Sequence, residues 1–246
     1  MTLEPNSHTL VDGSSEHRRR FLDWLLFHVE PDFLALWRRY MRALRQRNAA
    51  LRTGMAPDAE LAGWEGELAA SGTLLQSRRE ALLAELEPLL LAIAGTLVPG
   101  LELAGVRGRS GWPAGHGLAE ALAEGRASDR ERGFTQRGPH RADWRLVFGS
   151  GIEHGQLSRG QAKLAAYCCL LGQAALLRQR AGQLPVLAVD DLAAELDGDH
   201  QAALVDWLAE SGAQVLVTGT SVPQALPHGL PVRLFHVEQG GVRQLV

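Results

Sequence analysis

The stretch LSRGQAKLAAYCCLLGQAALLRQRAGQLPVLAVDD, residues 157–191, decides the fold because it joins a capped helix to a buried strand that ends in two acids. Ser158 stands where a helix N-cap is expected, and residues 159–178 carry apolar side chains at helical spacing on one face. Free backbone N–H groups at such a helix end, together with the serine hydroxyl, attract an anion such as phosphate. The alternative interpretation is that LSRGQ is only an N-cap.

The second half of the stretch, LPVLAVDD at residues 184–191, is an apolar run followed by Asp190 and Asp191. A fully apolar strand predicts burial on both faces, in the centre of a sheet whose carboxyl edge binds ligands. Adjacent carboxylates need a cation or a proton, and one can hold Mg²⁺ while the other orients an attacking water. The alternative is a polar turn in which an aspartate caps the next helix.

Composition indicates a soluble globular protein of one large or two small domains, with 246 residues of which 46% are hydrophobic and 22% charged. No apolar run reaches the length of a membrane span, and residues 1–13 lack the pattern of a signal peptide. We therefore expect a cytoplasmic protein with no membrane partner. The adjacent Cys168 and Cys169 predict core positions in a reducing compartment, and no HxxxH or CxxC pattern suggests a zinc or iron site.

The net charge of −3 is unevenly distributed along the chain. Residues 1–56 carry 9 arginines and 6 acids, whereas residues 57–105 carry 2 arginines and 8 acids. Residues 106–150 are basic again, with 8 arginines and 5 acids. This alternation predicts a local basic surface, so any contact with nucleic acid would be confined to one face.

Two helical stretches precede the α/β part. Residues 17–52 are helical in pattern with a break at Glu30-Pro31, and their apolar stripe leaves the arginines at 38, 39, 42, 45, 47 and 52 largely on the other face. A second helical stretch includes Leu75 to Leu97 and ends at Pro99-Gly100. An acidic helix opposite a basic one predicts an antiparallel hairpin that projects from a head.

Strand and helix signals alternate in the rest of the chain. Residues 104–117 are a linker or an irregular strand, and residues 118–124 favour a short helix. We expect strands at 144–148, 186–189 and 215–217, a helix at 199–210, and a closing hairpin of 233–238 with 242–246.

In this order the elements resemble the second lobe of an ABC-type ATPase head. The signature loop corresponds to residues 157–161, Walker B to LAVDD at 187–191, the D-loop to Leu196-Asp197, and the switch to a position near Thr220. Transporters usually have Glu and His where this chain has Asp191 and Thr220. These departures favour the DNA-maintenance branch over a transporter subunit.

Further segments resemble the RecF family of bacterial recombination mediators, in RecF order and over nearly all of the chain. They are VDGSSEHRRRFLDW (11–24), LRQRNAALR (44–52), FTQRGPHRADW (134–144), LSRGQAKL (157–164), VDDLAAELD (189–197) and LFHVEQGGV (234–242). RecF proteins often have GPHRDDL where this chain has GPHRADW, so Ala142 and Trp144 are departures. This segment is either a nucleotide contact or a turn in which Arg141 and Asp143 form an ion pair.

The resemblance implies an α/β fold, the second lobe of an ABC-type ATPase head with a helical arm subdomain. It implies that residues 1–13 are a remnant of the first ATPase lobe, 14–103 the helical arm, and 104–246 the lobe with signature and Walker B. A Walker A loop requires GxxxxGK[ST], and the only lysine, Lys163, lies in the signature helix. We therefore expect an incomplete RecF that lacks its N-terminal lobe, inactive alone and a slow ATPase when complete.

The resemblance also implies roles for individual residues and partners. In an ATP-dependent homodimer, Ser158, Gly160 and Gln161 would meet the γ-phosphate bound by the other subunit. Asp190 would hold Mg²⁺, Asp191 would be the catalytic group that orients or deprotonates water, Asp197 would communicate across the dimer, and Thr220 would be the switch. The cofactors are ATP and Mg²⁺, and the partners are DNA at double- and single-stranded junctions without sequence preference, and mediator proteins such as RecR.

The arginines of the first helical region have two interpretations. In RecF-like proteins DNA binding accompanies the ATP-bound dimer, and five arginines could neutralise phosphates without reading bases: Arg18, Arg19, Arg38, Arg42 and Arg45. The alternative is a plain solvated helix face.

Two functions from different classes therefore remain after the sequence alone. The first is a RecF-like ATP-dependent DNA-binding protein of recombinational repair and replication-fork maintenance. The second is a non-catalytic module that binds DNA or repair partners without nucleotide turnover, which the missing Walker A favours.

Overall fold

The computed structural model describes residues 1–149, 156–192, 196–222 and 231–245. Their contacts divide into two compact units: a larger unit of Asn6–Gln183, and a smaller unit of Met1–Pro5 with Leu184–Val246. The boundaries that the sequence suggested after residues 13 and 103 stay predictions.

The larger unit is mainly helical. Its helices are α1 (Thr9–Asp12), α2 (Ser15–Val29), α3 (Phe33–Thr53), α4 (Asp58–Leu97), α5 (Leu118–Arg132) and α6 (Arg159–Ala181), with short 3-10 turns η1 (Pro5–His8), η2 (Pro99–Leu101) and η3 (Pro139–Arg141). The strands β2 (Leu103–Arg109) and β3 (Asp143–Phe148) complete it. No helix in the described ranges combines the length and apolarity that crossing a membrane requires.

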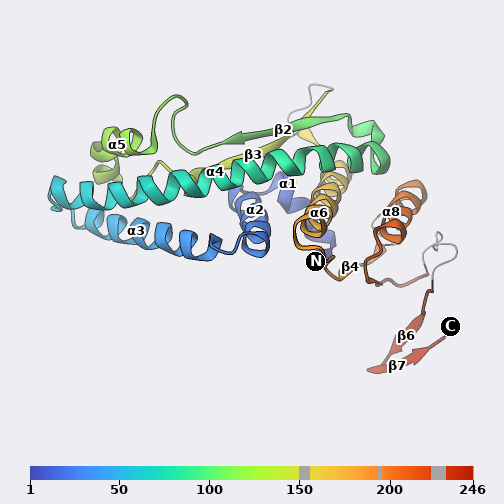
Figure 1. The fold of residues 1–246 in the computed structure, drawn as a ribbon. Helices are drawn as coiled ribbons and strands as arrows, with labels where there is room; N and C mark the ends of the chain where they lie inside the picture. The colour runs from blue at the N-terminus through green and yellow to red at the C-terminus, as the bar shows by residue number, and fades with distance from the viewer. Residues whose placement is uncertain (150–155, 193–195, 223–230, 246) are drawn as a thin grey trace. The chain divides into compact units, whose positions relative to one another are not determined.

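The predicted helical hairpin is confirmed as α3 and α4, which run side by side (Figure 1). Gly54 ends α3 in the left-handed conformation at φ 68°, and the chain then turns back through residues 54–57. Leu61, Leu68 and Leu75 of α4 are almost fully buried, as are Tyr40 and Leu51 of α3. At about 1.5 Å per residue, the 40 residues of α4 extend for ~60 Å.

One arginine of the hairpin lies where the sequence did not place it. The helical pattern put Arg47 on the solvent face, but its side chain is fully buried between α3, α4 and α5. It donates to Asp129 Oδ2 at 2.7 Å, to Thr135 Oγ1 at 2.8 Å and to Glu65 Oε1 at 2.9 Å. Arg47 is tolerated in the core because two carboxylates neutralise it.

The strands β2 and β3 form an antiparallel pair in which Leu103 faces Phe148 and Arg109 faces Asp143. The pair lies along α4, and Glu87 of that helix accepts a hydrogen bond from the backbone N–H of Val106 at 2.8 Å. The short helix predicted at 118–124 is twice as long in the structure and ends at Gly133, whose φ is 75°.

The helix α6 begins at the predicted position and packs against α4, α2 and α1. Gln173 donates to the carbonyl of Phe21 at 2.8 Å inside this packing. Cys168 and Cys169 are buried free thiols, and burial raises the pKa of Cys168 to about 12. The prediction that both are small core residues is confirmed.

The smaller unit contains a three-stranded parallel sheet in the order β1 (Thr2–Leu3), β4 (Leu187–Val189) and β5 (Val215–Val217). Helix α8 (Gly198–Ser211) connects the last two strands, and the predicted closing hairpin forms as β6 (Phe235–Glu238) and β7 (Gly241–Gln244). Because β4 lies between two parallel neighbours, its carboxyl end and that of β5 meet at one edge of the sheet.

Candidate functional site

The signature-like residues form a complete capping box at the start of α6. The Oγ of Ser158 accepts from the backbone N–H of Gln161 at 3.2 Å, and Gln161 Oε1 accepts from the N–H of Ser158 at 2.9 Å. The N-cap interpretation of this segment is therefore correct in itself. It does not exclude an anion site, because the cap leaves other first-turn N–H groups directed outward.

Gly160 lies in the first turn of α6, and no described residue crowds it. It is exposed, its φ is not positive, and a Cβ built on it would meet no atom within 4 Å. Glycine costs up to ~1 kcal/mol relative to alanine within a helix. The described residues therefore leave room for a ligand at Gly160, beside the exposed Ser158.

The paired aspartates follow β4 at the carboxyl edge of the parallel sheet, as predicted. Asp190 is exposed, and its Oδ1 accepts a hydrogen bond from the hydroxyl of Thr218 at 2.5 Å. The same hydroxyl accepts from the backbone N–H of Asp191 at 3.3 Å. Thr218 thus links both aspartates, and the sequence interpretation did not name it. Its position directly after β5 was the available signal, since β5 neighbours β4.

Asp191 combines two unusual features. Its φ is 53°, a positive value that is uncommon outside glycine, although aspartate adopts it more often than most residues. Its Oδ1 is buried and has no hydrogen-bond partner among the described residues. A strained backbone and an unsatisfied carboxylate oxygen each cost free energy, and such costs concentrate at functional sites.

The donor set at this edge fits Mg²⁺. Two neighbouring carboxylates provide hard oxygen ligands, and no described residue donates a hydrogen bond to Asp191 Oδ1. Asp190 is positioned by Thr218 rather than by a competing arginine or lysine. A divalent cation would compensate the charge of the pair.

The remaining predicted residues of this region have different surroundings. Asp197 is the N-cap of α8 and accepts from the backbone N–H of His200 at 3.1 Å; this bond, and that to the His200 side chain, lower the pKa of Asp197. Thr220 is exposed, two residues beyond Thr218.

Three of the five proposed DNA-binding arginines form one exposed row on α3. Arg38, Arg42 and Arg45 recur at spacings of four and three on the side opposite the buried residues of the helix. No described carboxylate forms an ion pair with any of the three, whereas their neighbour Arg39 is paired with Glu67. Within the described ranges, the row is therefore an exposed positive surface without an ion-pair partner.

The other two arginines lie on α2 and behave differently. Arg18 is 4% exposed and its guanidinium is paired with Asp143 at 2.7 Å, so it holds α2 to β3 and does not present its charge to a ligand. We correct the prediction on that ground. Arg19 is partly buried, donates to the carbonyl of Ala142 at 2.8 Å, and lines a cleft described below.

The GPHRADW segment does not contain the ion pair that the sequence suggested. Asp143 pairs with Arg18 and Arg145, and Arg141 lies over the ring of Phe134 at 5.3 Å.

Three potential metal ligands lie close together on and before α5: the ligand atoms of His116, Glu120 and Glu124 are within 4.8 Å of one another. All three residues are exposed, and Glu124 already pairs with Arg137.

The chain resembles known proteins over most of its length. No family model matches the chain. Curated relatives described as "DNA replication and repair protein RecF" include one from Xanthomonas oryzae pv. oryzae, 49% identical over 244 residues, covering 98% of this chain and 67% of the relative. The relative from Stenotrophomonas maltophilia is 48% identical and that from Chromohalobacter salexigens 40%, each covered over 66% of its length.

Solved structures show the same fold. The chain aligns over its full length with the recombination mediator protein RecF-ATP in the RecFOR pathway, at a TM-score of 0.82 and 21% identity, covering 68% of that protein. The RecF-ATPrS structure of the same pathway gives a TM-score of 0.81 at 22% identity. The chain therefore has the same fold as the matching part of these RecF structures.

The chain spans about two thirds of the length of the curated relatives that it matches. Over that length the identity to the Xanthomonas oryzae relative is 49%. The chain therefore belongs to the RecF family of DNA replication and repair proteins.

Proposed function

We propose that this chain supplies the signature and Walker B parts of a RecF-type, ATP-dependent DNA-binding protein of recombinational repair and replication-fork maintenance. The curated relatives are named for DNA replication and repair, and the solved neighbours are named for bound ATP or ATPrS. In this proposal two copies sandwich ATP, and the chain works with the mediator proteins of the RecFOR pathway, in the cytoplasm.

The observation that carries the proposal is the geometry of Asp191. An unsatisfied, buried carboxylate oxygen on a strained backbone, directly beside Asp190, stabilises nothing within the described residues. A site that receives a cation and a polarised water explains both costs.

Each residue at the sheet edge then has a role. Asp190 holds Mg²⁺, which supplies charge neutralisation at the phosphates when bound. Asp191 orients a water and accepts its proton through the free Oδ1. Thr218 holds Asp190 and the Asp191 backbone together, so that the two carboxylates keep separate tasks.

The helix end at Ser158 completes the site of the facing copy. Its first-turn N–H groups and the positive end of the α6 dipole favour a γ-phosphate. Gly160 lets that phosphate approach the backbone, which accounts for a glycine in open space. Gln161 holds the loop through the capping box, and Asp197 and Thr220 act at the dimer contact.

DNA contact is assigned to the row formed by Arg38, Arg42 and Arg45. These three guanidinium groups, which form no ion pair with a described carboxylate, lie along one helix and complement the negative charge of a phosphate backbone. Nothing in their arrangement reads the edges of bases. The contact is therefore independent of sequence.

The test of this proposal uses two nearly isosteric substitutions at one position. The chain is joined to the part of the Xanthomonas oryzae relative that it does not span, and ATP turnover is measured. Ser158→Asn and Ser158→Asp both retain a good N-cap, so both should fold with unchanged melting temperature. Ser158→Asp places a negative charge against the γ-phosphate and should abolish turnover, while Ser158→Asn keeps most of it. Equal turnover in the two variants would mean that LSRGQ is only a cap.

A further inference from the structure

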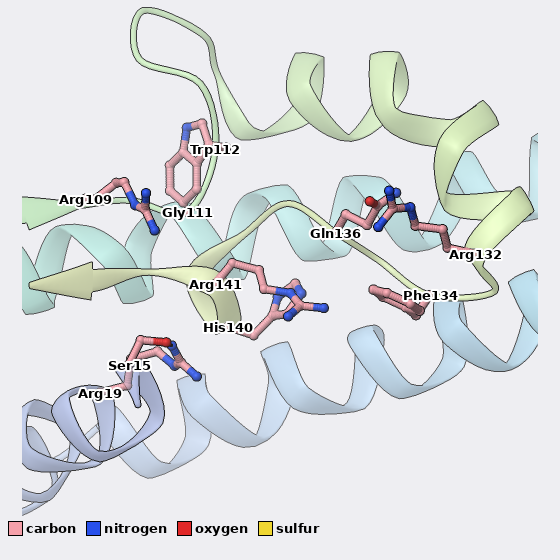
Figure 2. Close-up of a pocket in the computed structure, with 10 residues that line it drawn as sticks. All are labelled: Ser15, Arg19, Arg109, Gly111, Trp112, Arg132, Phe134, Gln136, His140 and Arg141. Atoms are coloured by element: carbon pink, nitrogen blue, oxygen red, sulfur yellow. The ribbon is translucent and has the colours of Figure 1, made fainter. Parts of the chain in front are cut away.

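A basic cleft of about 640 Å³ opens on the larger unit, and Arg19 is the one residue of its lining that the sequence assigned to DNA binding. Figure 2 shows its lining arriving from α2, from the end of β2 with the loop after it, and from the segment between α5 and β3. The lining residues are Ser15, Arg19, Arg109, Gly111, Trp112, Arg132, Phe134, Gln136, His140 and Arg141.

The charge of the cleft is entirely positive. Four of its ten residues are arginines and none is acidic. Arg109, Arg132 and Arg141 are exposed, and no described carboxylate forms an ion pair with any of them. In a chain with a net charge of −3 and 28 acidic residues, unpaired arginines gathered in one concavity indicate an anionic ligand.

The histidine in the cleft adds no charge but fixes its shape. His140 Nε2 lies 3.0 Å from the carbonyl of Thr135, so it is the donor there, and Nδ1 accepts from the hydroxyl of Tyr40 at 2.6 Å. Burial lowers the pKa of His140 to about 4, in agreement with a neutral ring. The ring therefore anchors the turn that presents Arg141.

The base of the cleft is held by two glycines that cannot be replaced without displacement. Gly111 has φ 92°, and a Cβ there would lie 2.3 Å from the carbonyl oxygen of Gly138. Gly138 has φ 139°, and its Cβ would lie 2.7 Å from the hydroxyl of Tyr40. A hydrogen bond of 3.1 Å from Gly138 N–H to the Gly111 carbonyl joins the two segments. The cleft is thus a built concavity rather than a gap between loops.

The aromatic residues of the cleft, Trp112 and Phe134, present ring faces to a ligand rather than free hydrogen-bonding groups. The indole N–H of Trp112 is already donated to the carbonyl of His116 at 3.1 Å, and the ring is only half-buried. Phe134 is half-buried and carries the guanidinium of Arg141 over its face. A half-exposed indole beside free guanidinium groups suits a planar base attached to phosphates.

We propose that this cleft binds an unpaired segment of one or two nucleotides of single-stranded DNA. Arg109, Arg132 and Arg19 take the phosphates, and a base stacks on Trp112. The volume lies in the range of small-ligand pockets, which excludes a duplex. An acidic peptide would use the arginines but leave the ring faces without a specific partner. The inference needs no ATP and so stands or falls separately from the proposed ATPase site.

The first experiment measures binding of a labelled oligothymidylate to the chain without ATP, by fluorescence anisotropy over a series of salt concentrations. Arg109→Gln with Arg132→Gln should weaken binding about tenfold and lower the slope of log affinity against log salt by ~1.4, since each single-strand phosphate contact contributes ~0.7. The matched control is Arg107→Gln, an exposed arginine on the same strand that does not line the cleft. Equal affinity and slope in the double variant and the control overturn the proposal.

The second experiment separates a base from a bare anion. Trp112→Leu should weaken oligothymidylate binding about five- to a hundredfold, Trp112→Phe should retain most of it, and an abasic strand should bind Trp112→Leu and the unsubstituted chain alike. Because Arg109 and Arg132 are exposed, their variants remain informative even if Trp112→Leu misfolds. The proposal is overturned if tripolyphosphate or polyglutamate competes as strongly as the oligothymidylate, or if duplex DNA binds as tightly and depends on the same arginines. Ser158→Asp should leave this binding unchanged.

Discussion

Replacing Arg47 by methionine should destabilise the larger unit severely. Arg47 is fully buried and donates to Glu65, Asp129 and Thr135. Glu65 would keep two hydrogen bonds from Arg126, at 2.6 and 3.1 Å. Asp129 would keep only bonds from Gln136, at 3.0 Å from the backbone N–H and 3.1 Å from the side chain. The substitution therefore leaves one buried carboxylate without a cation.

The expected loss in unfolding free energy follows from the partners that Asp129 loses and keeps. Removing one member of a buried ion pair costs about 3–5 kcal/mol, and Asp129 is 1% exposed, so we expect ~4 kcal/mol. This is a large part of the ~5–15 kcal/mol that keeps a typical domain folded. Adding Asp129→Asn should recover most of the lost free energy of unfolding. Neither charge of the Arg47–Asp129 pair is then present, and the hydrogen bonds from Gln136 can persist in part.

The assay is urea unfolding followed by helical circular dichroism. Arg39→Met is the matched control, since Arg39 lies on the same helix in an exposed pair with Glu67 and should show little change. A loss in Arg47→Met no larger than in the control, or no recovery in the double variant, would refute the reasoning that the arm depends on this buried network.

Three other predictions rest on separate features. The pKa of His140 is about 4 in the folded chain and ~6.5 when unfolded, so the unfolded state binds more protons between these values. The free energy of unfolding should therefore fall by ~1.6 kcal/mol from pH 6.5 to 5, and in His140→Gln that loss should vanish. Replacing Arg38, Arg42 and Arg45 by glutamine should lower the salt slope of duplex binding to the ATP-bound, completed protein by ~2.7, and an unchanged slope would restore the solvated-face interpretation. Exposed apolar side chains on β5, β6 and β7 predict ANS fluorescence and self-association of the purified chain, whereas a dye-silent monomer would contradict this.

The sequence predicted elements well wherever the signal was local. The capping residues at 158 and 161, the apolar strand before Asp190, and the stripes on α3 and α4 each depend on neighbours in the chain, and each formed as expected. Burial of arginine was not predictable in this way. Arg47 meets Asp129 at a separation of 82 residues, and Arg18 meets Asp143 at 125, so no local pattern separates them from surface charges.

The candidate sites also contain some residues that local sequence predicts and others that only the fold brings together. Asp190 and Asp191 could be proposed from the sequence because they follow an apolar strand. Thr218 follows β5, and only the pairing of β4 with β5 brings its hydroxyl to them. The basic cleft takes residues from three separate segments and has no sequence motif of its own. Its shape depends on the contact of Gly111 with Gly138, which only the fold creates.

The most direct test of the central claim mixes two inactive forms of the completed protein. One carries Ser158→Asp and the other Asp191→Asn, and ATP turnover is measured after the subunits exchange. If signature and Walker B residues act on the same nucleotide from opposite copies, half of the random dimers are mixed and one of their two sites is intact, so about a quarter of the original turnover should return. If the mixture stays as inactive as its components, the two sites do not act in trans and the account is contradicted.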